Sequence, residues 1–321
     1  GEVSVHQVNA GLSGEQRIRF DLFDKVAIYN HVNPTMKMHL VIAMYNAAHA
    51  VERNIAVIKS QTFTNFQCIL IDDISTDDTV ALTRKAIDGD ERFRLIVNEE
   101  KKYKTRNVVE GIEMAGADDE DVIVLLDGDD ELASENALQI VADTYARDDC
   151  WMTYGSYVHP DGSHATINRP YDEKVIRRNT FRKVRWLASH LKTFKYKLWK
   201  QLRPDIFLIT EEECRKACRR ALLQLRFRAW KNWRNIKASD LHDATGRYIR
   251  RVDDKAFTFA MLEMSGPRVS FIEDILYIYH YARPGDVPDK NYGADTSDKW
   301  YTRLVREVLK HKEPYSRLDS L

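Results

Sequence analysis

The sequence predicts an α/β fold built on a parallel sheet. Short apolar runs that indicate strands lie at 39–44, 67–71, 93–97 and 122–126, and segments with helical periodicity separate them. Strands that alternate with helices of this length form βαβ units, whose strands run parallel. Sheets of this kind bind ligands outside the carboxyl ends of their strands. We therefore expect the functional residues to lie at that edge.

Aromatic and acidic side chains follow the first two predicted strands. The strand at 39–44 leads into Tyr45, and the strand at 67–71 leads into Asp72 and Asp73. Between them, apolar residues recur at helical spacing over 51–58. Tyr45 and Asp73 are therefore expected at the ligand-binding edge, although Asp72 is equally explained as a residue that shapes the turn.

An acidic turn after the fourth predicted strand is the most informative feature. A predicted helix at about 104–116 leads to the strand at 122–126, and Asp127, Asp129 and Asp130 follow directly. Carboxylates this close repel one another and need a counter-charge. Hard oxygen ligands suit Mg²⁺ or Mn²⁺, and Mg²⁺ is usually bound by one or two carboxylates plus substrate phosphates. We interpret the turn as a platform for a metal and a diphosphate; a purely structural polar turn is the alternative.

Several motifs in this half resemble the family 2 glycosyltransferases of GT-A fold. The resemblance is strong over about 39–135 and looser over 186–285, where an acceptor-binding half would lie. It implies a nucleotide-diphosphate-sugar donor with UDP as the expected nucleotide, a divalent metal, and inversion at the anomeric carbon. The motifs are "AMYN" at 43–46, "SQTFTNF" at 60–66, "LIDDISTDDT" at 70–79, "TRN" at 105–107 and "LLDGDDEL" at 125–132, which contains the Asp-x-Asp (DXD) pattern.

The resemblance also implies roles for individual residues. Tyr45 would lie against the nucleotide base, and Asp73 would bond to the uracil or the ribose. Asp129 would ligate the Mn²⁺ or Mg²⁺ ion, with Asp127 approaching both ribose and metal. Lys104 is a further phosphate contact, or an ordinary loop lysine. The expected donor contacts are Ala43, Tyr45, Asp73, Arg106, Asn107, Asp127, Gly128 and Asp130.

The acceptor half should supply the catalytic base. Inverting transfer is a single displacement, so the acceptor hydroxyl must lose its proton as it attacks. An acid pair opens a predicted helix that runs through Phe257 to Gly266. Within that pair the resemblance favours Asp254 as the base, while helix capping is its structural alternative. Rival candidates are Asp240, Asp243 and Asp253.

Two histidines are secondary candidates. His280 lies on an alternating segment at 275–281, on the same face as apolar residues. Such a histidine is usually part of the core, and the functional alternative is a third metal ligand or a diphosphate contact. His190 is either an acceptor contact or a helix cap.

The second informative feature is a basic segment. The whole chain has 49 basic and 49 acidic residues, but 174–237 contains twenty Lys or Arg and four Asp or Glu. Thr210 and Glu213 form a capping-box pattern that predicts one long helix over 211–237, and the preceding 191–202 also has helical periodicity. Residues expected on the outer, acceptor- or polyanion-binding surface are Arg215, Arg219, Arg226, Lys231 and Arg234, with Trp186, Trp199, Trp230 and Trp233 interleaved.

This basic segment leaves several acceptors open. A solvated face, an anionic membrane surface and nucleic acid are all compatible with basic helices that carry aromatic residues. The acceptor is therefore a saccharide, a lipid-linked glycan, or a hydroxylated base in DNA, which would have to be extruded from the duplex. Two other classes compete: a non-catalytic polyanion-binding module, and a nucleotidyltransferase that would release pyrophosphate.

The predicted organisation has four parts. They are an N-terminal extension (1–38), a nucleotide-sugar half (39–135), an acceptor half (136–285, including the basic segment at 186–237) and a C-terminal tail or helix (286–321). No apolar run is long enough for a transmembrane helix, so we expect a cytoplasmic protein, with peripheral membrane contact as a further option. The four cysteines form no disulfide pattern and are expected to be reduced. The Gln-x-x-Arg-Trp motif of processive synthases is absent, which favours single additions.

Overall fold

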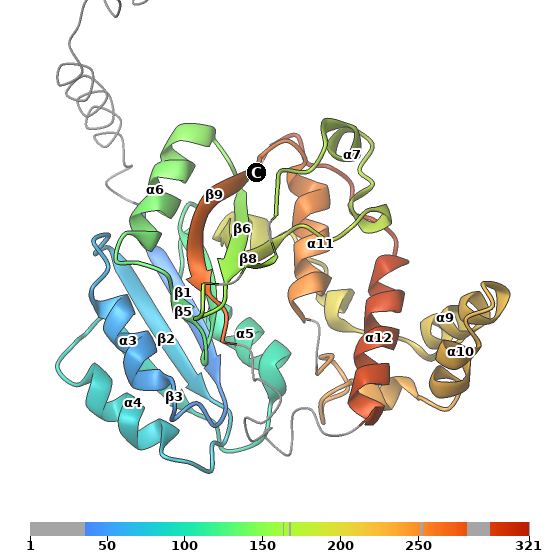
Figure 1. Ribbon diagram of the computed structural model, residues 1–321, viewed down its shortest axis with the longest axis horizontal. Helices are drawn as coiled ribbons and strands as arrows, with labels where there is room; N and C mark the ends of the chain where they lie inside the picture. Colours follow the sequence, from blue (N-terminus) through green and yellow to red (C-terminus); the bar gives the residue numbers. More distant parts are fainter. Residues whose placement is uncertain (1–35, 163, 167, 251–252, 281–295, 321) are drawn as a thin grey trace, which may run out of the picture.

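The computed structural model describes residues 36–162, 164–166, 168–250, 253–280 and 296–320. Its centre is one mixed sheet in the order β3-β2-β1-β4-β8-β6-β9-β5, with β7 paired to β6. Helices α9 to α12 gather to one side of this sheet (Figure 1). Apart from residues 36–38, the expected N-terminal extension lies outside the described residues.

The first half confirms the predicted βαβ pattern. Its four parallel strands pair in the order β3-β2-β1-β4, each in register with its neighbour. The loops at their carboxyl ends therefore meet at one edge, as the sequence predicts. The elements are β1 (Met38–Met44), α3 (Val51–Lys59), β2 (Phe66–Asp72), α4 (Thr79–Ile87), β3 (Phe93–Val97), α5 (Tyr103–Met114) and β4 (Val122–Asp127).

Both faces of this half-sheet are buried. Leu40 and Ile42 belong to a core with α3 and with α6 (Ala137–Asp148), whereas Val41 belongs to a second core with α5. This alternation follows from the two-residue period of a strand. Gly111 lets α5 approach closely, because a Cβ there would lie 2.6 Å from Val41 Cγ1. The helix that begins beside the functional edge is thereby held against the sheet.

The second half continues the sheet with antiparallel pairing. β8 runs antiparallel to β4, and β6 runs antiparallel to β8. β9 is parallel to β6, and the short β5 completes the far edge. The strands are β5 (Glu131–Leu132), β6 (Met152–Val158), β7 (His164–Thr166), β8 (Ser189–Lys195) and β9 (Val269–Ile278).

The expected helix over 191–202 is wrong. The chain forms β8 and then only one helical turn, α8 (Tyr196–Trp199). β8 lies between β4 and β6, and Leu191 and Phe194 are both buried although they lie on opposite faces. A strand that is buried on both faces shows no alternation, so its apolar spacing resembles that of a helix.

Helices build the remainder of the second half. α12 contacts α9, α10 and α11, and so joins the basic helices to the centre of this half (Figure 1). In the described chain, no helix combines the length and the apolar content that a bilayer span requires. The elements are α7 (Glu173–Arg177), η3 (Phe181–Lys183), η4 (Pro204–Phe207), α9 (Glu211–Leu223), α10 (Phe227–Trp233), η5 (Ala238–Leu241), α11 (Asp253–Ser265) and α12 (Thr296–Lys310).

The predicted single helix over 211–237 is also wrong. Its start is confirmed, because the Glu213 amide donates to Thr210 Oγ1 and Glu213 accepts from the Thr210 amide. α9 then stops in a Schellman motif, in which the Arg226 amide bonds to the Ala221 carbonyl at 2.8 Å and Leu225 has φ 56°. Glycine is the usual residue at that left-handed position, so a leucine there gave no signal of a break.

Candidate active site

A cavity of about 580 Å³ lies at the carboxyl edge of β1 and β4. α5, β8, α11 and α12 contribute its other walls, so both halves of the chain enclose it. Five of the residues considered in the sequence analysis line it: Ala43, Lys104, Asp127, His190 and Asp254. Its other charged and aromatic lining residues are Tyr157, His159, Lys192, Arg250, Phe257, Tyr279 and Arg306.

The acidic turn passes directly over the end of β1. A Cβ on Gly128 would lie 2.7 Å from Met44 Cγ and 3.0 Å from the Ala43 carbonyl oxygen, so only glycine fits without displacement. The amide of Asp127 donates to the Tyr277 hydroxyl at 3.3 Å. These contacts fix the turn where β4 meets the cavity.

Asp127 is ionised and paired across the cavity. Lys104 Nζ lies 2.5 Å from Asp127 Oδ1. Burial opposes ionisation of Asp127, but the Lys104 ammonium outweighs it and lowers the pKa of this carboxyl. Lys104 therefore lies on α5 and lines the cavity, and it is not the ordinary loop lysine that was the alternative.

Asp130 points into the protein. Its Oδ2 accepts from the Tyr277 hydroxyl at 2.6 Å, and its Oδ1 accepts from the His280 amide at 2.7 Å. Burial, followed by the charges of Asp127 and Asp129, raises the pKa of Asp130 to about 8. Because both oxygens are engaged, the expected donor contact by Asp130 stays a prediction that would require one of these bonds to open.

His280 is likewise engaged. Its Nε2 lies 2.8 Å from Glu131 Oε1, and Arg53 Nε donates to Glu131 Oε2 at 2.9 Å. This cluster joins α3, β5 and the end of β9. The core alternative for His280 accounts for these contacts, and its role as a metal ligand stays a prediction.

The donor set of the turn fits a metal that is shared with a substrate. Asp127 and Asp129 offer hard oxygen atoms, and Asp129 is exposed. Within the described residues, no group of three His, Cys, Asp or Glu side chains is arranged to hold an ion. Two carboxylates without a complete protein cage are typical of Mg²⁺-type sites that use substrate phosphates to complete coordination.

Asp73 organises the start of α5. Its carboxylate accepts from the amides of Lys102 at 2.8 Å and Tyr103 at 3.0 Å, and from Asn98 Nδ2 at 3.2 Å. Lys101 Nζ forms an ion pair with it at 3.2 Å. Asp73 therefore lies at the edge that the sequence predicts, but its side chain already bonds to the first amides of a helix.

The other residues predicted to contact the nucleotide lie near Asp73. Asn107 Oδ1 accepts from Asn98 Nδ2 at 2.7 Å, while Asn107 Nδ2 is buried without a partner in the described structure. Arg106 bonds to Glu110 at 2.7 Å and to Glu100. The Lys101 ammonium lies over the half-buried ring of Tyr45. Their contacts with a nucleotide stay predictions.

Asp254 faces the cavity from the first turn of α11. Its Oδ2 lies 3.4 Å from Nζ of Lys192, a lysine whose side chain is 4% exposed. Burial would raise the pKa of Asp254, but Lys192 and then Lys104 outweigh it and lower the pKa to about 2. The carboxylate is therefore ionised at neutral pH, as a base requires.

Two of the three rival acids lie outside the cavity wall. Asp240 accepts from the Lys237 amide at 2.9 Å and caps η5. Asp243 binds Thr245 Oγ1 at 2.7 Å within its own loop. The side chain of Asp253 lies outside the described part of the structure. Local hydrogen bonding thus accounts for Asp240 and Asp243, and neither lines the cavity.

Sequence reasoning missed Lys192 and undervalued His190. Lys192 on β8 is paired in register with Leu125 on β4, which brings it beside the acidic turn. No local pattern pointed to Lys192, because β8 has the sequence SHLKTFK, in which only Leu191 and Phe194 are apolar. The His190 ring stacks on Tyr277 with centroids 4.4 Å apart, and burial, with Lys192, lowers its pKa to about 3. His190 is therefore a neutral wall residue and caps no helix.

The basic side chains of α9 and α10 lie outside this cavity. All five predicted surface residues are exposed: Arg215, Arg219, Arg226, Lys231 and Arg234. The interleaved tryptophans point inward instead, since Trp199 and Trp233 are buried and Trp186 and Trp230 are half-buried.

These features define an α/β protein with an acidic turn and a basic wall at the carboxyl edge of its sheet. Residues 39–203, just over half of the chain, match the model of the family described as "Glycosyl transferase family 2". The chain belongs to this glycosyltransferase family, which confirms the resemblance found in the sequence.

Individual relatives match over shorter lengths. An uncharacterized glycosyltransferase of Haemophilus influenzae is 30% identical over 124 residues, which are 38% of this chain and 47% of that protein. The GalNAc(5)-diNAcBac-PP-undecaprenol beta-1,3-glucosyltransferase of Campylobacter jejuni is 28% identical over 99 residues, 30% of this chain and 31% of that protein. The chain thus spans half or less of the length of these relatives.

A solved structure supports the fold. Residues 1–349 of S. aureus TarS, in complex with UDP-GlcNAc, superpose with a TM-score of 0.53 at 14% identity, covering 84% of this chain and 65% of that chain. At this identity the likeness concerns the fold alone, and it confirms the predicted GT-A architecture.

Proposed function

We propose that this chain transfers a sugar from a UDP-sugar to an acceptor hydroxyl with inversion, using a divalent cation. The observation that carries the proposal is that Asp127 and Asp254 line one cavity from opposite halves of the chain. Each carboxylate is held ionised by a lysine, Lys104 and Lys192 respectively. A donor site and a base therefore face one reaction space.

The chain's own residues would divide the work as follows. Asp127 and Asp129 would hold a Mn²⁺ or Mg²⁺ ion, which when bound neutralises charge on the diphosphate. Lys104 lies beside the same turn and would contact a phosphate oxygen. TarS was solved with UDP-GlcNAc in the same fold, which supports a UDP-sugar as donor.

Asp254 would act as the general base. As the acceptor oxygen attacks the anomeric carbon, its proton moves to a carboxylate oxygen of Asp254, and the bond from that carbon to the diphosphate oxygen breaks. Lys192 keeps Asp254 ionised before the attack. The aromatic wall of Tyr157, His190 and Tyr279 would pack against the sugars and limit access of water.

A lipid-linked glycan is the acceptor that we favour. The Campylobacter relative is named for transfer to an undecaprenol-diphosphate glycan, which supports this class. Four Lys or Arg residues and two acids line the cavity, which suits an anionic ligand: Lys104, Lys192, Arg250 and Arg306, against Asp127 and Asp254. A hydroxylated DNA base is less favoured, because the tryptophans expected to stack on bases are buried or half-buried.

The test is a screen for UDP release. The full chain is incubated with individual UDP-sugars and Mn²⁺, with and without a polyprenyl-diphosphate glycan acceptor. We expect Mn²⁺-dependent UDP release that the acceptor accelerates. Release of pyrophosphate instead of UDP would assign the chain to nucleotidyl transfer, and no release with any donor would contradict the proposal.

A further inference from the structure

The turn between α9 and α10 exposes a continuous apolar tip. All seven residues at 222–228 are exposed. Four of them are large and apolar, with exposed fractions of 42% for Leu222, 83% for Leu223, 73% for Leu225 and 57% for Phe227. Isolated exposed apolar residues are ordinary, but four within six positions form a patch that marks an interaction site.

The tip is surrounded by positive charge. From 214 to 234 the chain contains eight Lys or Arg residues and no Asp or Glu. Arg226 and Arg228 alternate with the apolar residues of the tip itself. An exposed apolar patch in a segment whose charged residues are all basic matches the interface of an anionic bilayer, where lipid phosphates lie directly above the acyl chains.

A hollow of about 640 Å³ between α10 and α12 extends this surface. Five cations line it: Arg226, Arg228, Arg303, Arg306 and Lys310. In the described chain, Glu307 is the single acidic residue of its wall, and it pairs with Arg226 at 3.0 Å. The wall therefore retains a positive excess that phosphate groups would neutralise.

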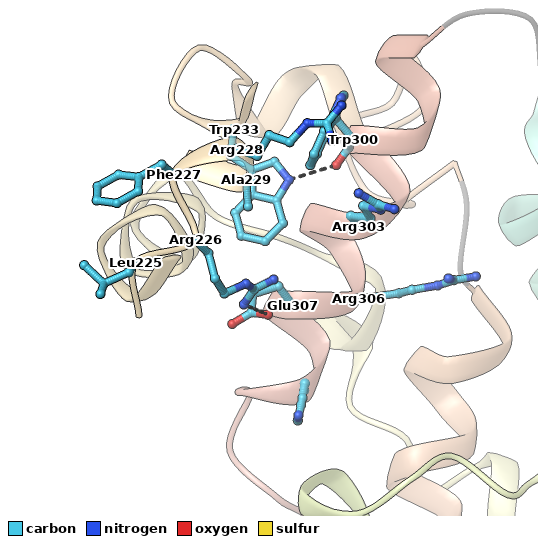
Figure 2. A pocket seen from close by; sticks show the side chains of 11 residues that line it. Leu225, Arg226, Phe227, Arg228, Ala229, Trp233, Trp300, Arg303, Arg306 and Glu307 are labelled. Carbon is cyan, nitrogen blue, oxygen red and sulfur yellow. Dashed lines mark hydrogen bonds and ion pairs between the residues drawn. The ribbon is translucent and has the colours of Figure 1, made fainter. Parts of the chain in front are cut away.

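The apolar side chains of the tip and the cationic side chains of the hollow point in different directions. Figure 2 shows Leu225 and Phe227 pointing outward, away from α12, while Arg226 reaches back to Glu307. Trp233 fills the space behind them and donates its indole N–H to the Trp300 carbonyl at 3.1 Å. The apolar tip is thus held on a rigid base, with the cationic hollow behind it.

The aliphatic character of the tip selects among polyanions. Nucleic-acid surfaces combine cations with aromatic rings that stack on bases. Here three of the four exposed apolar residues are leucines, which cannot stack, and the tryptophans of these helices are turned inward. Hydrocarbon is the environment that exposed leucines favour.

We propose that the α9–α10 turn docks this protein on an anionic phospholipid bilayer, with the apolar tip in the interface and the cationic hollow on lipid phosphates. Arg306 lines both this hollow and the active-site cavity, so docking would bring the bilayer to the acceptor side. This inference rests in part on the proposed lipid-linked acceptor. The flotation test therefore contains neither donor nor acceptor.

The test is flotation of the full chain with vesicles. Vesicles of phosphatidylcholine with phosphatidylglycerol should carry the protein, whereas phosphatidylcholine alone should not, and salt should weaken the binding. The triple variant Leu223→Ser/Leu225→Ser/Phe227→Ser should bind at least about tenfold more weakly. The charge variant Arg228→Glu/Lys231→Glu should lose binding by a similar factor.

The matched control replaces exposed apolar residues of the nucleotide half. Val97→Ser/Met114→Ser changes side chains that are 41% and 38% exposed and should float like the unchanged protein. UDP-sugar hydrolysis in solution reports on the fold of every variant and on the proposed function separately. A protein that releases UDP but does not float would overturn docking alone, and a protein that floats but releases no UDP with any donor, with or without acceptor, would overturn the function alone.

The experiment also distinguishes two other ligands of this surface, nucleic acid and a second copy of the chain. Nucleic acid would shift in gels with the triple serine variant as well as with the unchanged protein, and only the charge variant would lose it. A second copy of the chain would sediment as a dimer that the serine variant dissociates. Either result, in a protein that does not float with anionic vesicles, would overturn membrane docking.

Discussion

Lys192 Nζ lies 3.4 Å from Oδ2 of Asp254, inside the cavity that also contains Asp127. The lysine comes from a central strand and the aspartate from the first turn of α11. Lys192, and after it Lys104, lower the pKa of Asp254 to about 2, against the burial that would raise it. The ionisation of the proposed base therefore depends on a lysine that lies 62 positions away in the sequence.

Replacing Lys192 should therefore change the pH dependence of transfer. Without the ammonium the pKa of Asp254 rises, so a smaller fraction is ionised at a given acidic pH. We expect the acidic limb of kcat/KM in Lys192→Met to move to higher pH. Lys195→Met is the control, since Lys195 lies on the same strand but pairs with Glu120 at 2.8 Å. Identical acidic limbs in both variants would contradict the pairing.

Asp254→Asn tests the base itself. The amide keeps the shape of the side chain but cannot accept the proton, so transfer should fall by about 10²–10⁴ while UDP-sugar affinity is retained. Asp240→Asn is the control, because Asp240 caps η5 and lies outside the cavity wall. Steady-state transfer and calorimetry together decide, and near-normal transfer in Asp254→Asn would move the role to another acid.

The positions of Asp127 and Asp254 at the cavity could be predicted from the sequence. Asp127 follows a buried apolar run, and Asp254 belongs to an acid pair that opens a helix, within which the family resemblance favours it. Lys192 could not be assigned in this way, because its role depends on the pairing of β8 with β4. The sequence around Lys192 is mostly polar, and the carboxylate that pairs with this lysine comes from another part of the fold.

The errors in the fold have a similar origin. At the break between α9 and α10, Leu225 has a left-handed backbone conformation, and a glycine there would have indicated the end of the helix. The spacing of apolar residues in β8 resembles that of a helix, because burial on two faces removes the alternation of a strand. For Asp73 the sequence identified the edge of the sheet, but the amides that it binds belong to residues 102 and 103, about 30 positions later.

Asp73→Ala should destabilise the start of α5 as well as any nucleotide contact. It leaves the amides of Lys102 and Tyr103 without their acceptor and removes one of the two acceptors of Asn98 Nδ2, which still donates to Asn107 Oδ1. We expect the free energy of unfolding to fall by roughly 1–3 kcal/mol. Denaturant titration measures this, with Asp88→Ala at an exposed position as the control. Full stability combined with weaker UDP binding would favour a direct nucleotide contact instead.

Asp129→Ala should remove the metal dependence of donor binding. Asp129 is exposed beside Asp127, and its loss leaves too few oxygen ligands for the cation. We expect calorimetry to show UDP-sugar affinity that no longer responds to Mn²⁺, whereas Asp88→Ala should respond like the unchanged protein. An equal Mn²⁺ effect in both variants would place the cation elsewhere.

The stability of the second half should depend on a buried ion pair between Arg182 and Glu263. Arg182 donates to both carboxylate oxygens of Glu263, at 2.5 and 2.9 Å, and their side chains are 4% and 0% exposed. Glu263 also accepts from the Tyr315 amide at 3.0 Å, so the pair joins η3 and α11 to the C-terminal segment.

Arg182→Met keeps length and apolar contact but leaves the Glu263 carboxylate buried without its cation. Breaking a buried pair in this way should lower the free energy of unfolding by about 3–5 kcal/mol. The matched control is Lys216→Met, which removes an exposed pair with Glu212 on α9 and should change stability little. Arg182→Met/Glu263→Gln should recover part of the loss, because the buried charge is gone while an acceptor for the Tyr315 amide remains. Guanidinium unfolding of the four proteins measures these differences, and equal midpoints for Arg182→Met and Lys216→Met would show that the pair does not stabilise this half.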